Sequence, residues 1–255
     1  MLFRSTLNVT FRVADCDYYL RSGDAECTAH HVVVVPDTNL YTARMNATDS
    51  TEGGYVGSEM YTNNLLRAKA LFAAAFGANH LLTHREYLVN AVKDGKASGG
   101  AWFNSVVELL TEQMAYGAPQ FDSSAPDGSG GTDVWSKFHR YNVSCKQLNL
   151  FRHRPDLISN RQWYWLRNVV SAACFAYVSN NGNANYNNAS NSGSGVRPDS
   201  LPAQFADEFP CAGKGKEETS FAPDGCINAN RHATGYDRCS YWAVFFLLFV
   251  HERFS

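Results

Sequence analysis

The stretch Trp163-Tyr164-Trp165-Leu166-Arg167 alternates well enough to predict a β-strand, and a second apolar run follows it from Ala173 to Val178. The composition then changes abruptly, because asparagine fills seven of the twelve positions from Asn180 to Asn191. A segment this polar is unsuited to a core strand, since its amides would be buried without partners. We therefore predict core strands over these two runs. The asparagine-rich segment lies between two apolar segments that look like paired strands, and we interpret it as an exposed strand and loop held on a rigid scaffold.

The chain upstream of this stretch predicts a strand and then an amphipathic helix. The β-branched run from His31 to Val35, stopped by Pro36, is typical of a buried strand. From Thr62 the apolar residues recur at three- and four-residue steps, and Gly77 can end the helix that this period indicates. We expect an amphipathic helix over residues 62–76.

Two further helices are predicted between this helix and the strand at Trp163–Arg167. The segment Thr83-His84-Arg85-Glu86 has the form of a capping box, and an apolar face follows it up to Gly95. An apolar stripe from Trp102 to Met114 predicts the next helix, with a core-facing side. Glu108 and Glu112 lie four residues apart on that helix, a spacing that favours a solvated face over a catalytic pair.

Length and charge limit the classes of protein to which the chain can belong. With 255 residues, 45% of them hydrophobic, the chain can bury a substantial core. Its formal net charge is −2 and it has no long run of Lys or Arg, so we expect no direct nucleic-acid partner. The longest apolar run, Tyr241 to Val250, is about half the length that crosses a bilayer, so we expect no membrane insertion.

The first ten residues and the cysteines indicate where the chain folds. The N-terminus lacks the apolar stretch and cleavage site of a secretory signal, so we expect synthesis in the cytoplasm without a signal peptide. Seven irregularly spaced cysteines favour reduced, buried thiols over a disulfide framework. A weaker alternative is a zinc site made of Cys211, Cys226, His232 and Cys239.

Motifs for catalysis and cofactor binding are missing from the sequence. It contains no G-x-S-x-G elbow, no P-loop and no G-x-G-x-x-G after a strand. His80 and His84 have the spacing of metal ligands, but the capping box leaves His80 outside the helix, so packing or surface histidines are favoured. We therefore expect no catalytic residue, no cofactor and no metal.

The asparagine-rich segment offers recognition instead. Asn and Ser present donors and acceptors without charge, and Tyr adds a large rigid contact surface at small entropic cost. We predict that this segment is largely exposed and clusters on one face of the molecule; a merely solvated loop is the alternative. The candidate ligand-binding residues are Tyr177, Asn181, Asn183, Asn185, Tyr186, Asn187, Asn188 and Asn191.

Seven short segments occur in a characteristic order along residues 31 to 200. They are Gly53–Ser58, His84–Leu88, Gly99–Phe103, Tyr164–Arg167, Val169–Ala173, Phe175–Val178 and Gly195–Pro198. In this order, and with the asparagine-rich stretch, they resemble the variable, C-type-lectin-like proteins of diversity-generating retroelements and their relatives in gut bacteria and phages. The series is more specific than any one motif.

The resemblance implies an α+β, C-type-lectin-like fold with two or three helices packed on short antiparallel sheets. It implies an N-terminal strand region at 1–60, a core at 61–204 whose variable segment is 160–198, and a C-terminal tail at 205–255. The tail has no counterpart in the family, and we expect it to be dispensable for the core. The calcium-binding motifs of sugar-binding lectins are absent from the sequence.

The function implied is display of a diversifiable surface to a bacterial ligand. The partner would be a protein or glycan on a bacterial cell surface, and the chain would sit on a virion, at a tail or fibre tip, or on a bacterial surface, where a homo-oligomer is one arrangement. Alternatives are a virion structural protein without a receptor role and an enzyme resembling formylglycine-generating enzymes. Such enzymes use reactive cysteines, and Cys174 lies in an apolar run that predicts a buried, inert thiol.

Arg167 and Arg197 lie at the two ends of the variable stretch, each in an apolar context. A guanidinium there can bind carbonyls or a carboxylate and fix the ends of the loop. We therefore predict structural roles for both arginines, with anion binding as the alternative.

Overall fold

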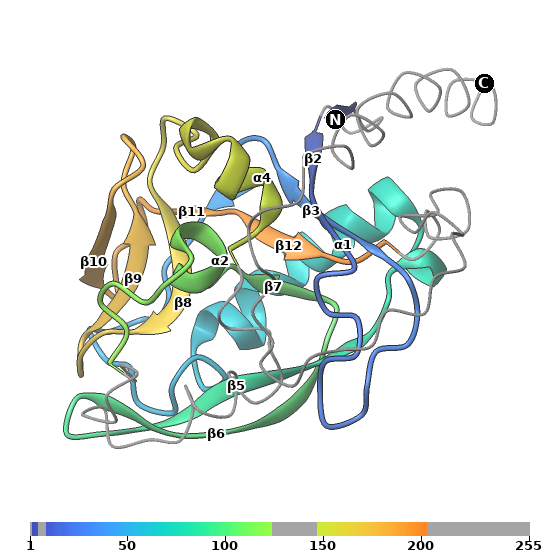
Figure 1. Ribbon diagram of the computed structural model, residues 1–255. Coiled ribbons are helices and arrows are strands. Elements are labelled where there is room, and N and C mark those ends of the chain that lie inside the picture. The colour runs from blue at the N-terminus through green and yellow to red at the C-terminus, as the bar shows by residue number, and fades with distance from the viewer. Residues whose placement is uncertain (1, 5–8, 124–146, 203–255) are drawn as a thin grey trace, which may run out of the picture.

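The computed structural model describes residues 2–4, 9–123 and 147–202 (Figure 1). Three predicted features lie outside these residues: the four-residue zinc alternative, the tail from 205 to 255, and the apolar run from Tyr241 to Val250. The described residues form an α+β fold with few helices and mostly antiparallel sheets. This agrees with the expected fold class at the level of α+β.

The first sheet contains the N-terminal strands and two strands from later in the chain. Its five strands are ordered β1-β2-β3-β12-β7, and every pair is antiparallel. The predicted strand at 31–35 is confirmed as β3, which is buried at every position. The bounds are Leu2–Arg4 for β1, Thr10–Cys16 for β2, Val32–Pro36 for β3, Val107–Leu109 for β7 and Pro198–Ser200 for β12.

The second sheet contains the quoted stretch and the asparagine-rich segment. Its order is β10-β9-β8-β11-β4, with β10 at one edge. Both predicted core strands are confirmed, as β8 and β9, and the exposed strand that was expected after them is β10. The bounds are Tyr41–Thr42 for β4, Tyr164–Val169 for β8, Cys174–Val178 for β9, Ala184–Asn188 for β10 and Gly195–Val196 for β11.

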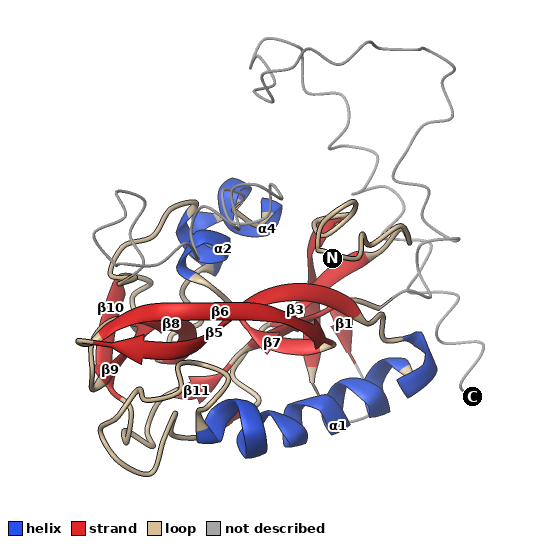
Figure 2. Ribbon diagram, turned by 90° about the horizontal axis from the view of Figure 1, so that it is seen from below, coloured by secondary structure: helices blue, strands red, loops and turns tan. Residues whose placement is uncertain are grey.

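Helices flank the sheets on opposite sides, as Figure 2 shows. The helix expected over 62–76 is confirmed as α1, Leu65–Phe76, which continues from a π-helical turn at Met60–Asn64. On the other side lie the short helices α2, Glu112–Tyr116, and α4, Asn149–His153. Two 3-10 turns complete the described helical segments, at Ala78–His80 and Pro155–Leu157.

The second sheet separates two hydrophobic clusters. Trp165 and Phe175 lie in the cluster that contains Phe72 of α1. Their neighbours along the strands, such as Tyr164, lie in the cluster that contains Phe151 of α4. Because successive side chains of a strand point to opposite faces, the sheet is buried on both faces at its centre.

The helix predicted from the capping box at Thr83 is wrong. Residues His84–Lys93 form strand β5, which pairs with β6, Lys96–Ser105, in a long hairpin. Asp94 and Gly95 make its turn with φ values of 52° and 74°, the geometry that Asp-Gly favours in two-residue hairpins. The Asp-Gly pair was therefore the informative signal, and the capping-box pattern was coincidental.

The helix predicted from Trp102 to Met114 is also wrong, because this stretch is divided among β6, β7 and α2. The prediction of a core-facing side survives for Met114, which is buried, but the solvated face does not. Glu108 in β7 and Glu112 in α2 are 1% and 0% exposed. Both carboxyl groups therefore belong to the interior.

Gly100 provides a test of the hairpin. A Cβ added there would lie 2.5 Å from Cε1 of Tyr87 and 2.9 Å from the Leu88 carbonyl oxygen, whereas one added at Gly99 would be 3.3 Å from its nearest atoms. Gly100→Ala should therefore lower the free energy of unfolding by about 1–3 kcal/mol. Gly99→Ala should cost less than about 1 kcal/mol in urea unfolding. If both substitutions stabilise the protein, as Gly→Ala does within a helix, the strand assignment is contradicted.

Candidate binding surface

The asparagine-rich residues form the edge hairpin of the second sheet. Strands β9 and β10 are joined by residues 179–183, where the amides of Ser179 and Gly182 bond to the carbonyl oxygens of Asn183 and Ser179, both at 2.9 Å. Five of the eight candidate residues are exposed: Asn181, Asn183, Asn185, Tyr186 and Asn188. Tyr177, Asn187 and Asn191 are half-buried. The prediction that this segment is largely exposed is confirmed.

The prediction that these residues share one face is wrong, because strand alternation divides them. Asn185 lies opposite Tyr177 in the β9–β10 register, and these two side chains share one face of the sheet. Tyr186 lies opposite Ala176, on the other face. The hairpin therefore presents polar and aromatic groups on both of its sides.

Asparagine side chains also cover the free edge of β10. Hydrogen bonds at both ends of the hairpin, including Ala189 N to Ala173 O, fix a register in which the amides of Tyr186 and Asn188 point away from β9. Each of these amides donates to the side-chain oxygen of the preceding asparagine at 2.8 Å, from Tyr186 to Asn185 and from Asn188 to Asn187. Because unpaired edge donors invite strand pairing, these two asparagines protect the edge.

Three of the candidate asparagines have further bonds that shape the loops. Asn181 Oδ1 accepts from the Ser179 hydroxyl, and Asn191 Oδ1 accepts from the amide of Gly193 at 3.0 Å. Asn188 donates to Asp49 at 2.8 Å. Among the candidate residues, Asn183 and Tyr186 are exposed and have side chains outside these bonds, so their side chains are the best placed for a ligand.

Sequence reasoning missed two exposed aromatic residues that flank the hairpin. Trp163, just before β8, is 47% exposed, and its ring centroid lies 6.3 Å from that of Tyr177. Phe121, which follows α2, is 38% exposed, and its ring lies 5.2 Å from that of Tyr186, itself 48% exposed. Among the described residues, Leu66 of α1 is the one other exposed large hydrophobic side chain. An aromatic pair therefore lies on each side of the hairpin.

The backbone of Trp163 is held firmly although its side chain is exposed. Its carbonyl oxygen accepts from Asn39 Nδ2 at 2.9 Å and from the Gly195 amide at 2.8 Å. Gly195 packs so closely that an added Cβ would lie 1.9 Å from Asn39 Nδ2. The backbone of Trp163 is therefore fixed before a ligand binds, which reduces the entropy that binding would cost.

Glu112 fixes the loop that carries Phe121. Its carboxylate accepts from the amides of Gln120, Phe121 and Asp122, at 2.8, 3.0 and 3.0 Å respectively. Burial raises the pKa of Glu112 to about 7, against the opposing effect of these amides. The residue interpreted as part of a solvated helix face therefore organises one side of the hairpin surface.

Both arginines at the ends of the variable stretch have structural roles, as predicted. Arg197 is fully buried, and its guanidinium donates to the carbonyl oxygens of Pro36, Leu157 and Ile158 at 3.0–3.2 Å. Arg167 is 5% exposed and forms an ion pair of 2.5 Å with Glu86. Neither side chain points freely into solvent beside the asparagines.

A buried charged cluster surrounds Arg167. His84 and Glu86 of β5 are bonded to each other at 2.9 Å, Glu108 of β7 accepts from the Tyr55 hydroxyl at 2.8 Å, and Asp199 of β12 accepts from Tyr19 at 3.2 Å. Burial opposes the ionisation of Glu86, but Arg167 and His84 hold its pKa at about 2. Burial and the charge of Glu86 raise the pKa of Glu108 to about 7 and that of Asp199 well above its ordinary value.

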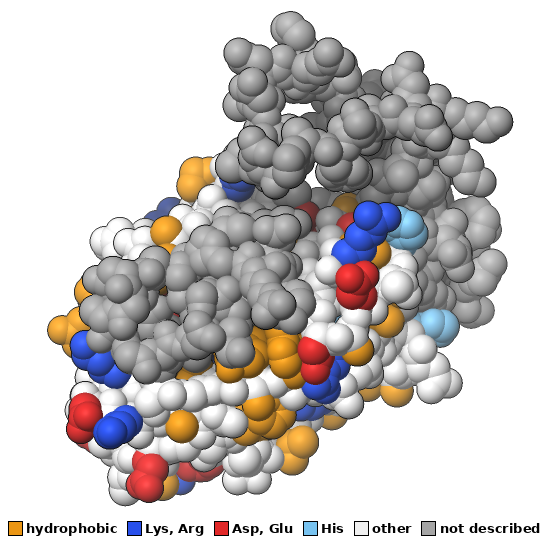
Figure 3. Space-filling view, turned by 60° about the horizontal axis from the view of Figure 1, so that its bottom comes forward, with side chains coloured by type: hydrophobic (Ala, Val, Ile, Leu, Met, Phe, Trp, Pro, Cys, Tyr) orange, Lys and Arg blue, Asp and Glu red, His pale blue; other side chains and the backbone are white. Residues whose placement is uncertain are grey.

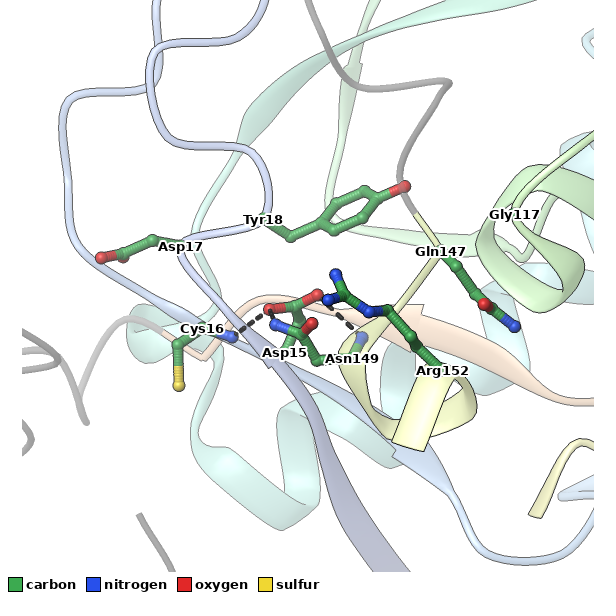
Figure 4. Close-up of a pocket in the computed structure, with 8 residues that line it drawn as sticks. All are labelled: Asp15, Cys16, Asp17, Tyr18, Gly117, Gln147, Asn149 and Arg152. Atoms are coloured by element: carbon green, nitrogen blue, oxygen red, sulfur yellow. Dashed lines mark hydrogen bonds between the residues drawn. The ribbon is translucent and has the colours of Figure 1, made fainter. Parts of the chain in front are cut away.

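A separate cavity of about 410 Å³ opens beside β2 and α4 (Figure 4). The carboxylate of Asp15 is directed at Asn149, accepting from its amide at 3.0 Å and its side chain at 2.7 Å, while the thiol of Cys16 points away. Because Asp15 serves these internal bonds, this cavity is a weaker candidate than the hairpin. The lining residues are Asp15, Cys16, Asp17, Tyr18, Gly117, Gln147, Asn149 and Arg152.

Cys174 differs from the sequence expectation. It was predicted to be buried, but it is half-buried, and its thiol donates to Asn188 Oδ1 at 3.4 Å. The reason is its position at the start of β9, opposite the exposed Asn188. Within the described residues Cys16, Cys27 and Cys174 form no disulfide.

The surface on the side of the β5–β6 hairpin is mixed in character. Figure 3 shows hydrophobic side chains on it, with acidic and basic side chains interspersed rather than separated by sign. No helix within the described part of the chain is long and apolar enough to span a membrane.

Comparisons with known proteins provide no relative for this arrangement. No family model matches the chain, and neither a curated protein nor a solved structure matches it. The proposals below therefore depend on the residues and geometry of the chain itself.

Glu108 predicts a loss of stability as the pH rises. Its pKa is higher in the folded chain than its ordinary value of 4.5, so the stability that neutral Glu108 contributes is complete below pH 4.5 and is lost as the pH rises through about 7. The free energy of unfolding should fall between about pH 5 and pH 8, by about 3 kcal/mol from this residue. Glu108→Gln, which imitates the neutral form, should reduce this fall in urea titrations at the two pH values.

Exposed Glu52 supplies the matched control, since Glu52→Gln should leave the fall unchanged. A Glu108→Gln protein with the same pH dependence as the parent chain would contradict the assignment. A smaller dependence should remain in that variant, because Glu112 and Asp199 also have raised pKa values.

Proposed function

We propose that this chain is a binding protein that displays the β9–β10 hairpin to a ligand on a bacterial surface, without catalysis. The single observation that supports the proposal most strongly is the concentration of exposed side chains there. Three of the four exposed large hydrophobic residues in the described part of the chain, Phe121, Trp163 and Tyr186, lie at this hairpin among exposed asparagines. Rigid aromatic groups beside adaptable amides are a mixture typical of binding loops.

The architecture supports a division between scaffold and display. The strands behind the hairpin are buried on both faces at the centre of the sheet. By contrast, β10 and the loop before it have no large buried side chain. Substitutions at such positions alter the surface and leave the core packing intact. This is the property that a diversifiable display protein requires.

We extend the proposal to the fold family of the chain and to the surface on which it acts. The chain would have a C-type-lectin-like fold of the kind found in variable proteins of diversity-generating retroelements, and it would act on a virion or bacterial surface. Support comes from the motif series and from the position of the asparagine-rich segment on an edge hairpin. A reverse transcriptase gene near the coding sequence, with a repeat differing at adenines, would support this assignment.

A double variant, Asn183→Ala with Tyr186→Ala, tests the proposal. Both side chains are exposed, so each substitution should change the free energy of unfolding by no more than about 0.5 kcal/mol. Binding of the labelled full-length chain to a panel of intact bacterial cells should fall at least about tenfold, an equivalent of about 1.4 kcal/mol.

Trp165→Ala is the scaffold control. Trp165 is fully buried, so this variant should lose about 3–5 kcal/mol of stability. Equal stability losses in the two variants would show that display surface and scaffold are not separable. Unchanged cell binding by the double variant, or absence of binding by the parent chain to every strain, would contradict the proposed function.

A further inference from the structure

The absence of charged residues from the hairpin indicates the chemical class of its ligand. This inference rests on the proposed function. From Asn168 to Val196 the chain contains no Asp, Glu, Lys, Arg or His. At the overall charged fraction of 18%, a stretch of this length would hold about five charged residues. We propose that the hairpin binds an uncharged carbohydrate, through stacking on its exposed aromatic rings and hydrogen bonds to its asparagine amides.

The chemistry of the exposed groups matches a neutral sugar. The face of an aromatic ring carries negative charge density and attracts the weakly positive C–H groups on one face of a sugar ring. Trp163 and Tyr186 offer such rings, at 47% and 48% exposure. Each asparagine amide offers both donors and an acceptor, which suits hydroxyl groups that act in both ways.

Charged ligands fit this surface poorly. Sialylated, uronic or phosphorylated glycans are recognised by paired Arg or Lys, and the hairpin has neither. A protein partner would normally meet charges that steer association and fix its register. Strand addition by a peptide is also opposed, because Asn185 and Asn187 already occupy the outward amides of β10.

Charged residues next to the hairpin come from other elements and are already engaged or peripheral. Asp49 accepts from Asn188 and from the Ser190 amide at 3.1 Å. Asp122 accepts from Asn168 at 2.6 Å. Arg161 is exposed in the loop before β8, two residues before Trp163 in the sequence. The uncharged character is therefore a property of the hairpin itself.

The experiment measures retention of the full-length chain on immobilised neutral polysaccharides, namely dextran, mannan and galactan, and on anionic dextran sulfate and polygalacturonate. We expect retention on at least one neutral polymer, competition by its free oligosaccharides, and little change between about 50 and about 500 mM NaCl. The double variant Trp163→Ala with Tyr186→Ala, which removes the exposed ring from each side of the hairpin, should weaken retention at least about tenfold. Leu66→Ala, at the exposed hydrophobic residue of α1, should not weaken it.

The same chain is then applied to the cells that it binds, after treatment with periodate or with proteinase K. Loss of cell binding after periodate alone supports the carbohydrate assignment. Retention only on anionic polymers, loss of cell binding after proteinase K alone, or equal weakening by Leu66→Ala overturns that assignment and leaves the proposed binding function standing. Absence of binding to all the polymers and all the cells overturns both.

Discussion

The ion pair between Arg167 and Glu86 is the interaction on which the arrangement of the sheets depends. Arg167 belongs to the second sheet, Glu86 to the β5–β6 hairpin, and the nearby acids Glu108 and Asp199 to the first sheet. One cation is thus surrounded by three carboxyl groups in the interior. Burial and mutual repulsion prevent all three carboxyl groups from ionising together, and the pKa values of Glu108 and Asp199 are raised as a consequence.

A scaffold fixed in this way allows the edge hairpin to differ from it chemically. The buried Arg167 and Arg197 bind Glu86 and backbone carbonyl oxygens in the interior, and charge is absent from the segment between them. The hairpin is then free to carry amides and aromatic rings. Its own asparagines protect its edge, so the surface can be exposed without inviting strand pairing.

The sequence predicted the elements whose signals are local. The helix at α1 and the strands β3, β8 and β9 followed from period and β-branching, and both arginines were placed correctly. The β5–β6 hairpin was missed because Tyr87, Leu88, Ala91 and Val92 also fit a helical period, and the Asp94-Gly95 turn was taken for a helix end.

The parts of the site that the sequence did not reveal depend on contacts between distant segments. Phe121 joins the surface because Glu112 holds its loop and because Tyr186, far along the chain, lies beside it. Trp163 is exposed because it lies just before β8, which begins at Tyr164. Burial of Glu108 and Glu112 follows from tertiary packing, which no spacing of two acids indicates.

A double-mutant cycle on Arg167→Met and Glu86→Gln, measured as free energies of unfolding at pH 7, tests the central claim most directly. Each single variant removes the main partner of a buried charge and should lose about 3–5 kcal/mol, and the double variant should lose at least about 2 kcal/mol less than the two losses combined. Losses that add to within about 0.5 kcal/mol would show that the pair does not hold the sheets together.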